Sequence, residues 1–217
     1  QVCQNLGVTR LVLASTSPAR LSLLRAGGIE PVTIAPEVDE EAVGSRAEAM
    51  GLIGSSEDLV LLLAKAKAEA VVSHPEAQNA IIIGCDSALE FGGKTLGKPH
   101  EPEVATARWK QLRGNSGTLH SGHWLIDNRT GVTMPPATGK TSSTTVHFAN
   151  ITDREIEAYV ATGEPLKVAG AFTVDGLGGA FLSKIEGDTH TVIGLSLPTL
   201  RELSQVLGVE YTSYWNR

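Results

Sequence analysis

The stretch LVLASTSPARLSLLRAGG, residues 11–28, decides the fold of this chain. Its four leading apolar residues, 11–14, predict a buried strand because turn-forming residues follow them directly. Ser17 followed by Pro18 is typical of a helix start, and the apolar spacing beyond it predicts a helix that ends at Gly27. A strand that runs into a helix begins a βα unit, so we expect an α/β fold.

The remainder of the chain continues this mixture of helices and strands. Besides the first helix at 19–26, helical patterns occur at 57–74, 101–112, 152–163 and 197–208. Strand patterns occur at 32–34, 80–91, 118–127, 131–134, 143–148, 170–174 and 180–185, and the acidic segment 35–43 is expected to form a polar turn. We find no internal repeat or low-complexity linker, so we expect a mixed sheet flanked by helices in a single domain, 1–217.

Composition and charge narrow the class of protein. The chain has 217 residues, of which 41% are hydrophobic, and no apolar run approaches the ~20 residues of a membrane span. The two cysteines, Cys3 and Cys85, are too few for a disulfide scaffold, and the chain shows no secretory signal pattern at its start, so we expect a cytoplasmic protein. A net charge of −6 without a Lys/Arg block argues against a nucleic-acid partner, and the lack of a long apolar run argues against a membrane partner.

The junction between the first strand and helix has the chemistry of an anion site. Ser15, Ser17 and backbone N–H groups converge at a helix N-terminus, where the helix dipole favours a negative charge. Arg20, one turn further along, could add bidentate contacts to phosphate. The alternative is that Ser17 merely caps the helix.

A second signal is a carboxylate inside an apolar strand. Burying Asp86 in IIIGCDSALEF is costly unless it is paired or bound to metal, which makes it a candidate general base or metal ligand. Lys98, in LGKP, could neutralise this carboxylate or reach a phosphate, and the alternative is a purely structural Asp–Lys pair. Asp39 and Glu40 could be oxygen ligands for a hard divalent cation, or part of a solvated acidic loop.

Two other patterns carry less weight. His120 and His123 form an H-x-x-H pattern, but no third ligand lies near them in the sequence, so we do not expect zinc. Cys85 lies in an apolar strand and is more typical of a buried, inert thiol than of a nucleophile. An anion cradle, a buried acid, lysines and a spare carboxylate together favour metal-assisted attack on a phosphate ester.

The order of these motifs resembles the Maf family of nucleoside triphosphate pyrophosphatases over nearly the whole chain. The matching segments are LVLASTSPARLSLL, APEVDEEAV, LLLAKAKA, IIIGCDS, LGKP and AGAFTVDGLGGAFLSKIEGD. The resemblance implies an ITPase-like (Maf/Ham1) architecture, in which two lobes on a twisted mixed sheet enclose a cleft, and commonly a homodimer. It also implies hydrolysis of a nucleoside triphosphate to the monophosphate and pyrophosphate with a divalent cation, Mg²⁺ or Mn²⁺.

The resemblance assigns roles by position in the motifs. Asp86 matches the proton acceptor that activates the attacking water, and Glu40 and Asp86 are the expected metal ligands. The other catalytic positions implied are Lys67 and Lys98, and the phosphate-gripping positions are Ser15, Ser17 and Arg20.

Three substrate-binding positions depart from the pattern of relatives that prefer dTTP and UTP. Ala19 replaces a basic residue, Ser87 replaces Thr, and Asp175 replaces Gln. Because a carboxylate accepts hydrogen bonds from a guanine edge and repels a uracil carbonyl, Asp175 tilts the expectation toward purines such as 7-methyl-GTP. The competing reading of the whole chain is a non-catalytic nucleotide-binding regulator of cell division or septum formation.

Overall fold

The structure, a computed structural model, describes residues 7–216, and its centre is a seven-stranded mixed sheet. Six strands follow the order β2-β1-β3-β5-β6-β7, and the seventh, β4, pairs with β3 outside this order. The strands are β1 (Leu11–Ala14), β2 (Val32–Thr33), β3 (Ile81–Phe91), β4 (Lys94–Leu96), β5 (Ser116–Asp127), β6 (Ala137–Phe148) and β7 (Leu182–Glu186). Strand β1 is parallel to β2 and β3, and all other pairings are antiparallel. The predicted mixed α/β sheet is therefore confirmed.

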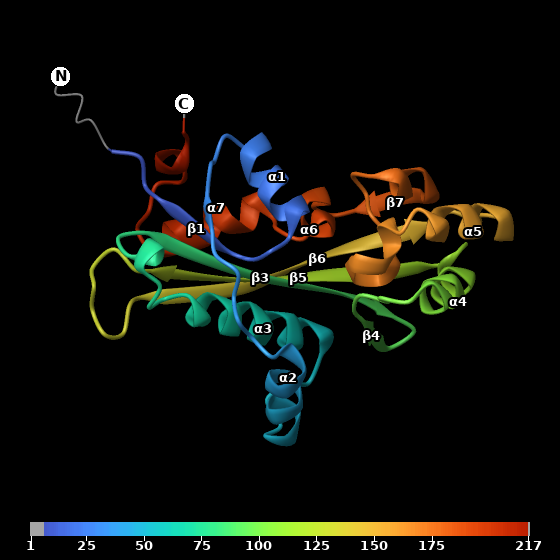
Figure 1. Cartoon of the computed structure of the whole chain (residues 1–217), viewed down its shortest axis with the longest axis horizontal. Coiled ribbons are helices and arrows are strands. Elements are labelled where there is room, and N and C mark those ends of the chain that lie inside the picture. The colour runs from blue at the N-terminus through green and yellow to red at the C-terminus, as the bar shows by residue number, and fades with distance from the viewer. Residues whose placement is uncertain (1–6, 217) are drawn as a thin grey trace.

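Helices cover both faces of this sheet (Figure 1). The α-helices are α1 (Pro18–Ala26), α2 (Glu40–Ala49), α3 (Ser56–Ala70), α4 (Pro102–Leu112), α5 (Asp153–Ala161), α6 (Thr189–Ile193) and α7 (Leu197–Val206). Short 3-10 helices are η1 (Pro75–Ala77), η2 (Glu164–Lys167), η3 (Ala169–Ala171), η4 (Leu177–Phe181) and η5 (Tyr211–Tyr214). Over residues 7–216, none of the helices has the length and apolar character needed to cross a bilayer.

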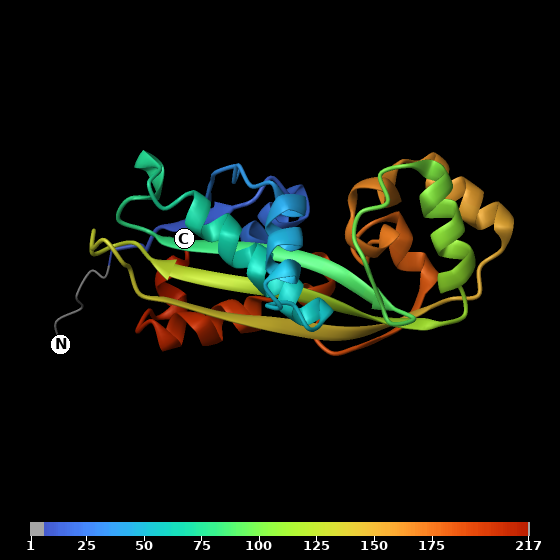
Figure 2. The same ribbon diagram turned by 90° about the horizontal axis from the view of Figure 1, so that it is seen from below.

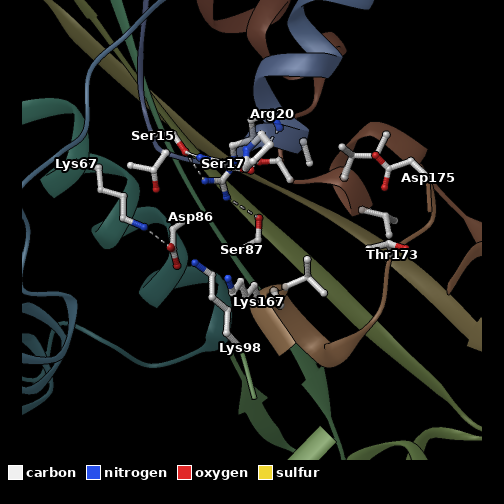
Figure 3. A pocket seen from close by; sticks show the side chains of 18 of the residues that line it. Ser15, Ser17, Arg20, Lys67, Asp86, Ser87, Lys98, Lys167, Thr173 and Asp175 are labelled. Atoms are coloured by element: carbon white, nitrogen blue, oxygen red, sulfur yellow. Dashed lines mark hydrogen bonds and ion pairs between the residues drawn. The ribbon is translucent and has the colours of Figure 1, made fainter. Parts of the chain in front are cut away.

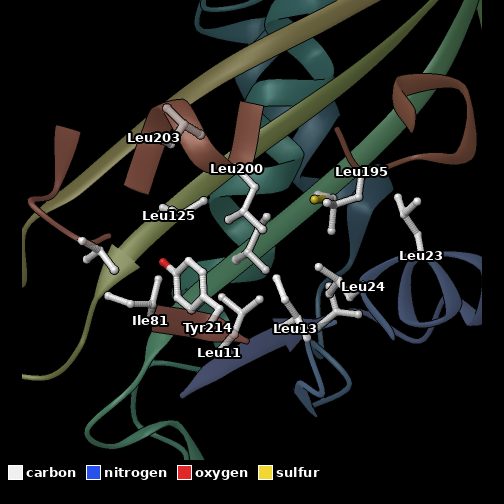
Figure 4. Packing of buried hydrophobic residues seen from close by; sticks show 14 residues of the cluster. Leu11, Leu13, Leu23, Leu24, Ile81, Leu125, Leu195, Leu200, Leu203 and Tyr214 are labelled. Atoms are coloured by element: carbon white, nitrogen blue, oxygen red, sulfur yellow. The ribbon is translucent and has the colours of Figure 1, made fainter. Parts of the chain in front are cut away.

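The side chains of β1 divide between two apolar layers, because successive residues of a strand point to opposite faces. Leu11 and Leu13 pack with α1 and α7 on one face (Figure 4). Val12 and Ala14 pack on the other face, where α3 contributes Ala68. The short β1 is thus buried on both sides, as its uninterrupted apolar sequence predicts.

A separate apolar cluster lies at the other end of the long strands β3, β5 and β6, under α4 and α5 (Figure 2). Trp109 is its centre, with edge-to-face contacts to Phe148, Tyr159 and Phe181 at centroid distances of 5.6, 5.7 and 6.0 Å. The indole N–H of Trp109 donates to the carbonyl of Ala171 at 2.7 Å. The three strands therefore connect two separately packed halves of the molecule, which agrees with the expected pair of lobes.

Three of the predicted local elements are wrong. Segment 131–134 belongs to the connection before β6, where Gly131 has φ of +64° and two prolines follow. Segment 170–174 bends through η3 instead of forming a strand, because Gly170 and Ala171 both have positive φ.

The expected polar turn at 35–43 is also incorrect in its second half. Helix α2 begins at Glu40, and the Asp39 carboxylate caps it by accepting a hydrogen bond from the N–H of Ala42 at 2.9 Å. The acidic run is a helix N-terminus, where negative charge is stabilising. Asp39 is therefore a capping residue and not a free oxygen ligand.

Two glycines of the sheet allow the backbone of α3 to approach closely. A Cβ atom at Gly84 would lie 2.2 Å from the carbonyl oxygen of Ala64, and a Cβ at Gly122 would lie 2.3 Å from that of Val60. Both obstacles are helix backbone, which no side-chain rotation can move aside. The absence of side chains at these positions fixes the distance between α3 and the sheet.

We expect Gly84→Ala to displace α3 and to lower the free energy of unfolding by about 1–3 kcal/mol, the usual cost of overpacking. Chemical denaturation monitored by circular dichroism measures the change. Gly44→Ala is the matched control, because a Cβ there meets only Leu59 at 3.7 Å and alanine favours a helix. Equal stability of the two variants would contradict this account of the packing.

Candidate functional site

A gap in strand pairing places a cavity at the middle of β3. Strand β1 pairs with β3 up to Gly84, and β4 pairs with it from Leu89 onward. Along this edge, no strand of the described chain pairs with the residues between them. A cavity of about 550 Å³ opens there, and Asp86 and Ser87 line it.

All ten residues predicted for the site line this one cavity (Figure 3). They come from both halves of the molecule and are Ser15, Ser17, Ala19, Arg20, Glu40, Lys67, Asp86, Ser87, Lys98 and Asp175. The lining also includes residues that the sequence analysis does not predict, among them Lys167, Thr173 and Gly194. Thr173 lies in the same matched segment as Asp175, which is a local signal for it.

The deepest charged group in the cavity is a carboxylate held by a lysine. Lys67 Nζ lies 2.6 Å from Asp86 Oδ1 and 2.8 Å from Glu40 Oε1. The side chains of Lys67 and Asp86 are only 10% and 14% exposed, whereas that of Glu40 is 51% exposed. The ion-pair partner of Asp86 is therefore Lys67, and of the two roles open to Lys98, neutralising Asp86 and reaching a phosphate, Lys67 fills the first.

Burial changes the acidity of Asp86. Desolvation raises the pKa of Asp86 above its ordinary value, and the adjacent Lys67 ammonium only partly offsets this effect. A raised pKa makes the ionised carboxylate a stronger base than a solvent-exposed aspartate. No hydrogen bond from the described residues reaches Oδ2 of Asp86, so that oxygen is available to a water or ligand.

Arg20 is held in place by three of its five donors. Its Nε donates to the carbonyl of Gly194 at 2.8 Å, Nη1 to Ser15 Oγ at 3.2 Å and Nη2 to Ser87 Oγ at 3.2 Å. The helix cap that the sequence predicts is also present, with the N–H of Arg20 donating to Ser17 Oγ at 3.4 Å. One further N–H on each terminal nitrogen remains for an anion, which suits a phosphate.

The hydroxyl of Ser87 is supported from beneath. Ser87 Oγ lies 2.7 Å from Ser121 Oγ, which in turn donates to the carbonyl of Thr191 at 2.8 Å. Ser121 is fully buried. These hydrogen bonds link the guanidinium of Arg20, through Ser87 and Ser121, to β5 and α6. Because the N–H of Arg20 also donates to Ser17, the same residue belongs to the helix cap and to the anion cradle.

Two cations reach the cavity from the other half of the molecule. Lys98 follows β4 and Lys167 ends η2, and both ammonium groups point toward Asp86 in Figure 3. Within residues 7–216, neither lysine has a hydrogen-bond or ion-pair partner. Together with Arg20, they give the cavity unneutralised positive charge beside the Lys67–Asp86 pair, an arrangement that attracts a polyanion.

The remaining predicted candidates behave as structural groups. Burial raises the pKa of Cys85 to about 11, so its thiol stays protonated and inert. His123 is buried with its pKa lowered to about 4, while His120 bonds Ser143 and Glu90. No cluster of three or more His, Cys, Asp or Glu residues suited to a metal occurs in the described part of the chain, and Cys3 lies outside that part.

The fold and the cavity together define a class: an α/β protein with hydroxyl and guanidinium donors at a helix N-terminus and a buried, lysine-paired carboxylate in a cavity lined by both halves. A family model described as Maf-like protein matches residues 10–207. The chain therefore belongs to the Maf family, as the motifs predict.

Named relatives agree with this assignment. A protein of Leifsonia xyli subsp. xyli named nucleoside triphosphate pyrophosphatase is 54% identical over 210 residues, covering 96% of this chain and 97% of its own. A protein of Salinispora tropica with the same name is 50% identical and covers 96% and 88%. The solved structure of the Staphylococcus aureus Ham1 protein aligns over 95% and 94% of the two chains at 13% identity, with a TM-score of only 0.38.

We expect Lys67→Met to raise the pKa of Asp86 further, because it removes the positive charge that favours the ionised carboxylate. Carbon-13 NMR of the aspartate carboxyl groups measures the titration, with Asp86→Asn identifying the resonance. Lys65→Met is the control, since Lys65 lies on the same helix but over the ring of Trp124. An unchanged or lower pKa of Asp86 in Lys67→Met would contradict the described electrostatics.

Proposed function

We propose that this chain hydrolyses a nucleoside triphosphate to the nucleoside monophosphate and pyrophosphate. The observation that carries the proposal is the basic carboxylate of Asp86, with one free oxygen, beside the preorganised Arg20 cradle. A buried acid next to a phosphate site repels a ligand that is merely to be bound, so its presence favours chemistry over binding alone. The names of the relatives support the same activity.

Asp86 is the proposed general base. Its ionised Oδ2 accepts a proton from a water molecule, which attacks the α-phosphorus as the bond to pyrophosphate breaks. Lys67 holds Oδ1 and orients the carboxylate. Because the ionised form is the active one, kcat/KM falls as the pH drops through the raised pKa of Asp86.

The cationic groups have a second role in this proposal. The free donors of Arg20 and the ammonium groups of Lys98 and Lys167 bind the phosphate chain and offset the charge that develops on the leaving pyrophosphate. Their placement on both sides of the cleft requires the substrate to bridge the two halves. Water outside the cleft is thereby kept from the reacting phosphate.

A divalent cation, Mg²⁺ or Mn²⁺, fits the donor set of the cavity. Glu40 and Asp86 lie on the same side of the cavity, each with one carboxylate oxygen held by Lys67 Nζ, and Glu40 Oε2 together with Asp86 would hold the cation beside that ammonium. Two carboxylates together with substrate phosphates are a common set for Mg²⁺, which keeps several waters. When bound, the cation would neutralise phosphate charge.

The residues at the nucleoside end of the cavity select the nucleobase in this proposal. Asp175 and Thr173 lie on the far side of the cavity from Asp86 (Figure 3). The carboxylate of Asp175 would accept hydrogen bonds from a guanine edge, which favours a purine over a pyrimidine. Ala19 leaves room in the cavity where dTTP- and UTP-directed relatives carry a basic side chain.

Three further expectations stay predictions. The homodimer rests on the family resemblance, whereas the cytoplasmic location and the absence of nucleic-acid partners rest on composition and charge. The competing function, a non-catalytic nucleotide-binding regulator of cell division, would need the same cavity but no turnover.

We expect Asp86→Asn to lower turnover by about 10²-fold or more, the usual contribution of a general base, because an amide cannot accept the proton. Pyrophosphate release from a panel of standard and modified nucleotides with Mg²⁺ or Mn²⁺ measures it, and circular dichroism verifies the fold. Asp153→Asn is the control, because Asp153 pairs with Arg113 outside the cavity. Unchanged turnover in Asp86→Asn would remove Asp86 as the base, and an inactive wild type would favour the regulator.

A further inference from the structure

A single carboxylate organises the backbone at the nucleoside end of the cavity. Glu164 Oε1 accepts hydrogen bonds from Thr173 Oγ1 at 2.5 Å, Tyr159 Oη at 2.8 Å and the N–H of Gly178 at 3.0 Å. Its Oε2 accepts from the N–H of Leu177 at 3.0 Å. Four donors from η4, α5 and the segment between η3 and η4 thus converge on one side chain.

The backbone is shaped around this carboxylate. A Cβ atom at Gly176 would lie 2.7 Å from Glu164 Oε2, and a Cβ at Gly178 would lie 2.3 Å from Tyr159 Oη. Only glycine allows the segment to pass this close to the buried polar groups. Gly176 and Gly178 of the GLGG run are therefore explained by Glu164 and its partners, whereas a Cβ at Gly179 would meet the carbonyl of Val174 at 2.7 Å.

The carboxylate is in its charged form at neutral pH. Partial burial raises the pKa of Glu164, but hydrogen bonds from Thr173, Gly178 and Leu177 lower it by more, so the pKa lies below the ordinary value. Hydrogen bonds to an ionised acceptor are stronger than neutral ones. The segment 173–178 is consequently held by charge-assisted bonds although it contains no regular strand.

This segment carries Thr173 and Asp175, which line the cavity opposite Asp86 (Figure 3). We propose that Glu164 is a positioning residue that fixes residues 173–178. It thereby determines the affinity of the cavity for nucleosides and its selectivity among them. The inference rests on the proposed function, because it assigns that end of the cavity to the nucleoside. Glu164 itself does not line the cavity and acts only through the segment.

Replacing Glu164 with Gln removes the negative charge but nearly keeps the size and shape of the side chain. An amide has one accepting oxygen, and its NH₂ group would face donors that Glu164 now satisfies. Leaving such donors unpaired is costly, so we expect the segment to loosen and nucleotide binding to weaken by about tenfold. Binding of a ligand without a nucleoside should not change, because the phosphate groups are held elsewhere.

Calorimetric binding of three ligands to the full chain tests the inference. The probes are α,β-methylene analogues of GTP and UTP, whose reacting bond is blocked, and inorganic tripolyphosphate, all with Mg²⁺. Glu186→Gln is the matched control, a hydrogen-bonded carboxylate on β7 that does not line the cavity. Tyr159→Phe is the second variant, since it removes one donor to Glu164 and keeps the ring.

The expected result is about tenfold weaker binding of the preferred analogue by Glu164→Gln, with an altered GTP-to-UTP ratio, and tripolyphosphate affinity within about twofold of wild type. Tyr159→Phe should also weaken binding of the preferred analogue, but by less. This variant tests the inference even if Glu164→Gln does not fold. Equal weakening of all ligands, or no change in analogue binding, would overturn the inference. The proposed hydrolysis fails separately, if wild type binds the analogues but releases no pyrophosphate from natural nucleotides.

Discussion

The buried pair of Lys67 and Asp86 is the interaction on which the rest of the arrangement depends. A carboxylate in the centre of an apolar strand is tolerated only because an ammonium group from α3 lies 2.6 Å away. That ammonium can reach it because Gly84 and Gly122 let the backbone of α3 lie against the sheet. The closeness of one helix to one sheet therefore determines the chemistry of the cavity.

The position of the cavity follows from strand lengths. Strand β1 is short and ends at Ala14, whereas β3 continues past it into the second half of the molecule. Beyond the end of β1, the chain turns into α1. Ser15, Ser17 and Arg20 therefore lie beside the part of the β3 edge that has no paired strand among the described residues. The Arg20 end of the cavity and the end that carries Asp175 are thus supported by different apolar cores, which the long strands β3, β5 and β6 connect.

Much of the fold could be predicted from the sequence, because many of its elements depend on residues that are neighbours in the chain. The βα unit at residues 11–28 and the cap at Ser17 depend on neighbouring residues, and both are as expected. The charge of the acidic run predicts a solvated loop, whereas in the structure Asp39 followed by two glutamates is the start of helix α2. The strands expected at 131–134 and 170–174 failed because positive φ angles, invisible in apolar patterns, bend the chain there.

Contacts across the fold were beyond sequence reasoning. The lysine that pairs with Asp86 proved to be Lys67 and not Lys98, a choice that the packing of α3 makes. Likewise Ser121 and Gly194 act through partners at distant positions in the chain, Ser87 and Arg20, and no residue near them in the sequence points to those partners. The order of the motifs identified the residues of the cavity. The hydrogen bonds and ion pairs among these residues became visible only in the structure.

The central claim is that the geometry directs water to the α-phosphorus. Hydrolysis of a nucleoside triphosphate in ¹⁸O-labelled water, followed by mass spectrometry of both products, tests it most directly. The account predicts that the label appears in the nucleoside monophosphate and that the pyrophosphate is unlabelled. Label in the pyrophosphate, or release of labelled orthophosphate, would contradict it.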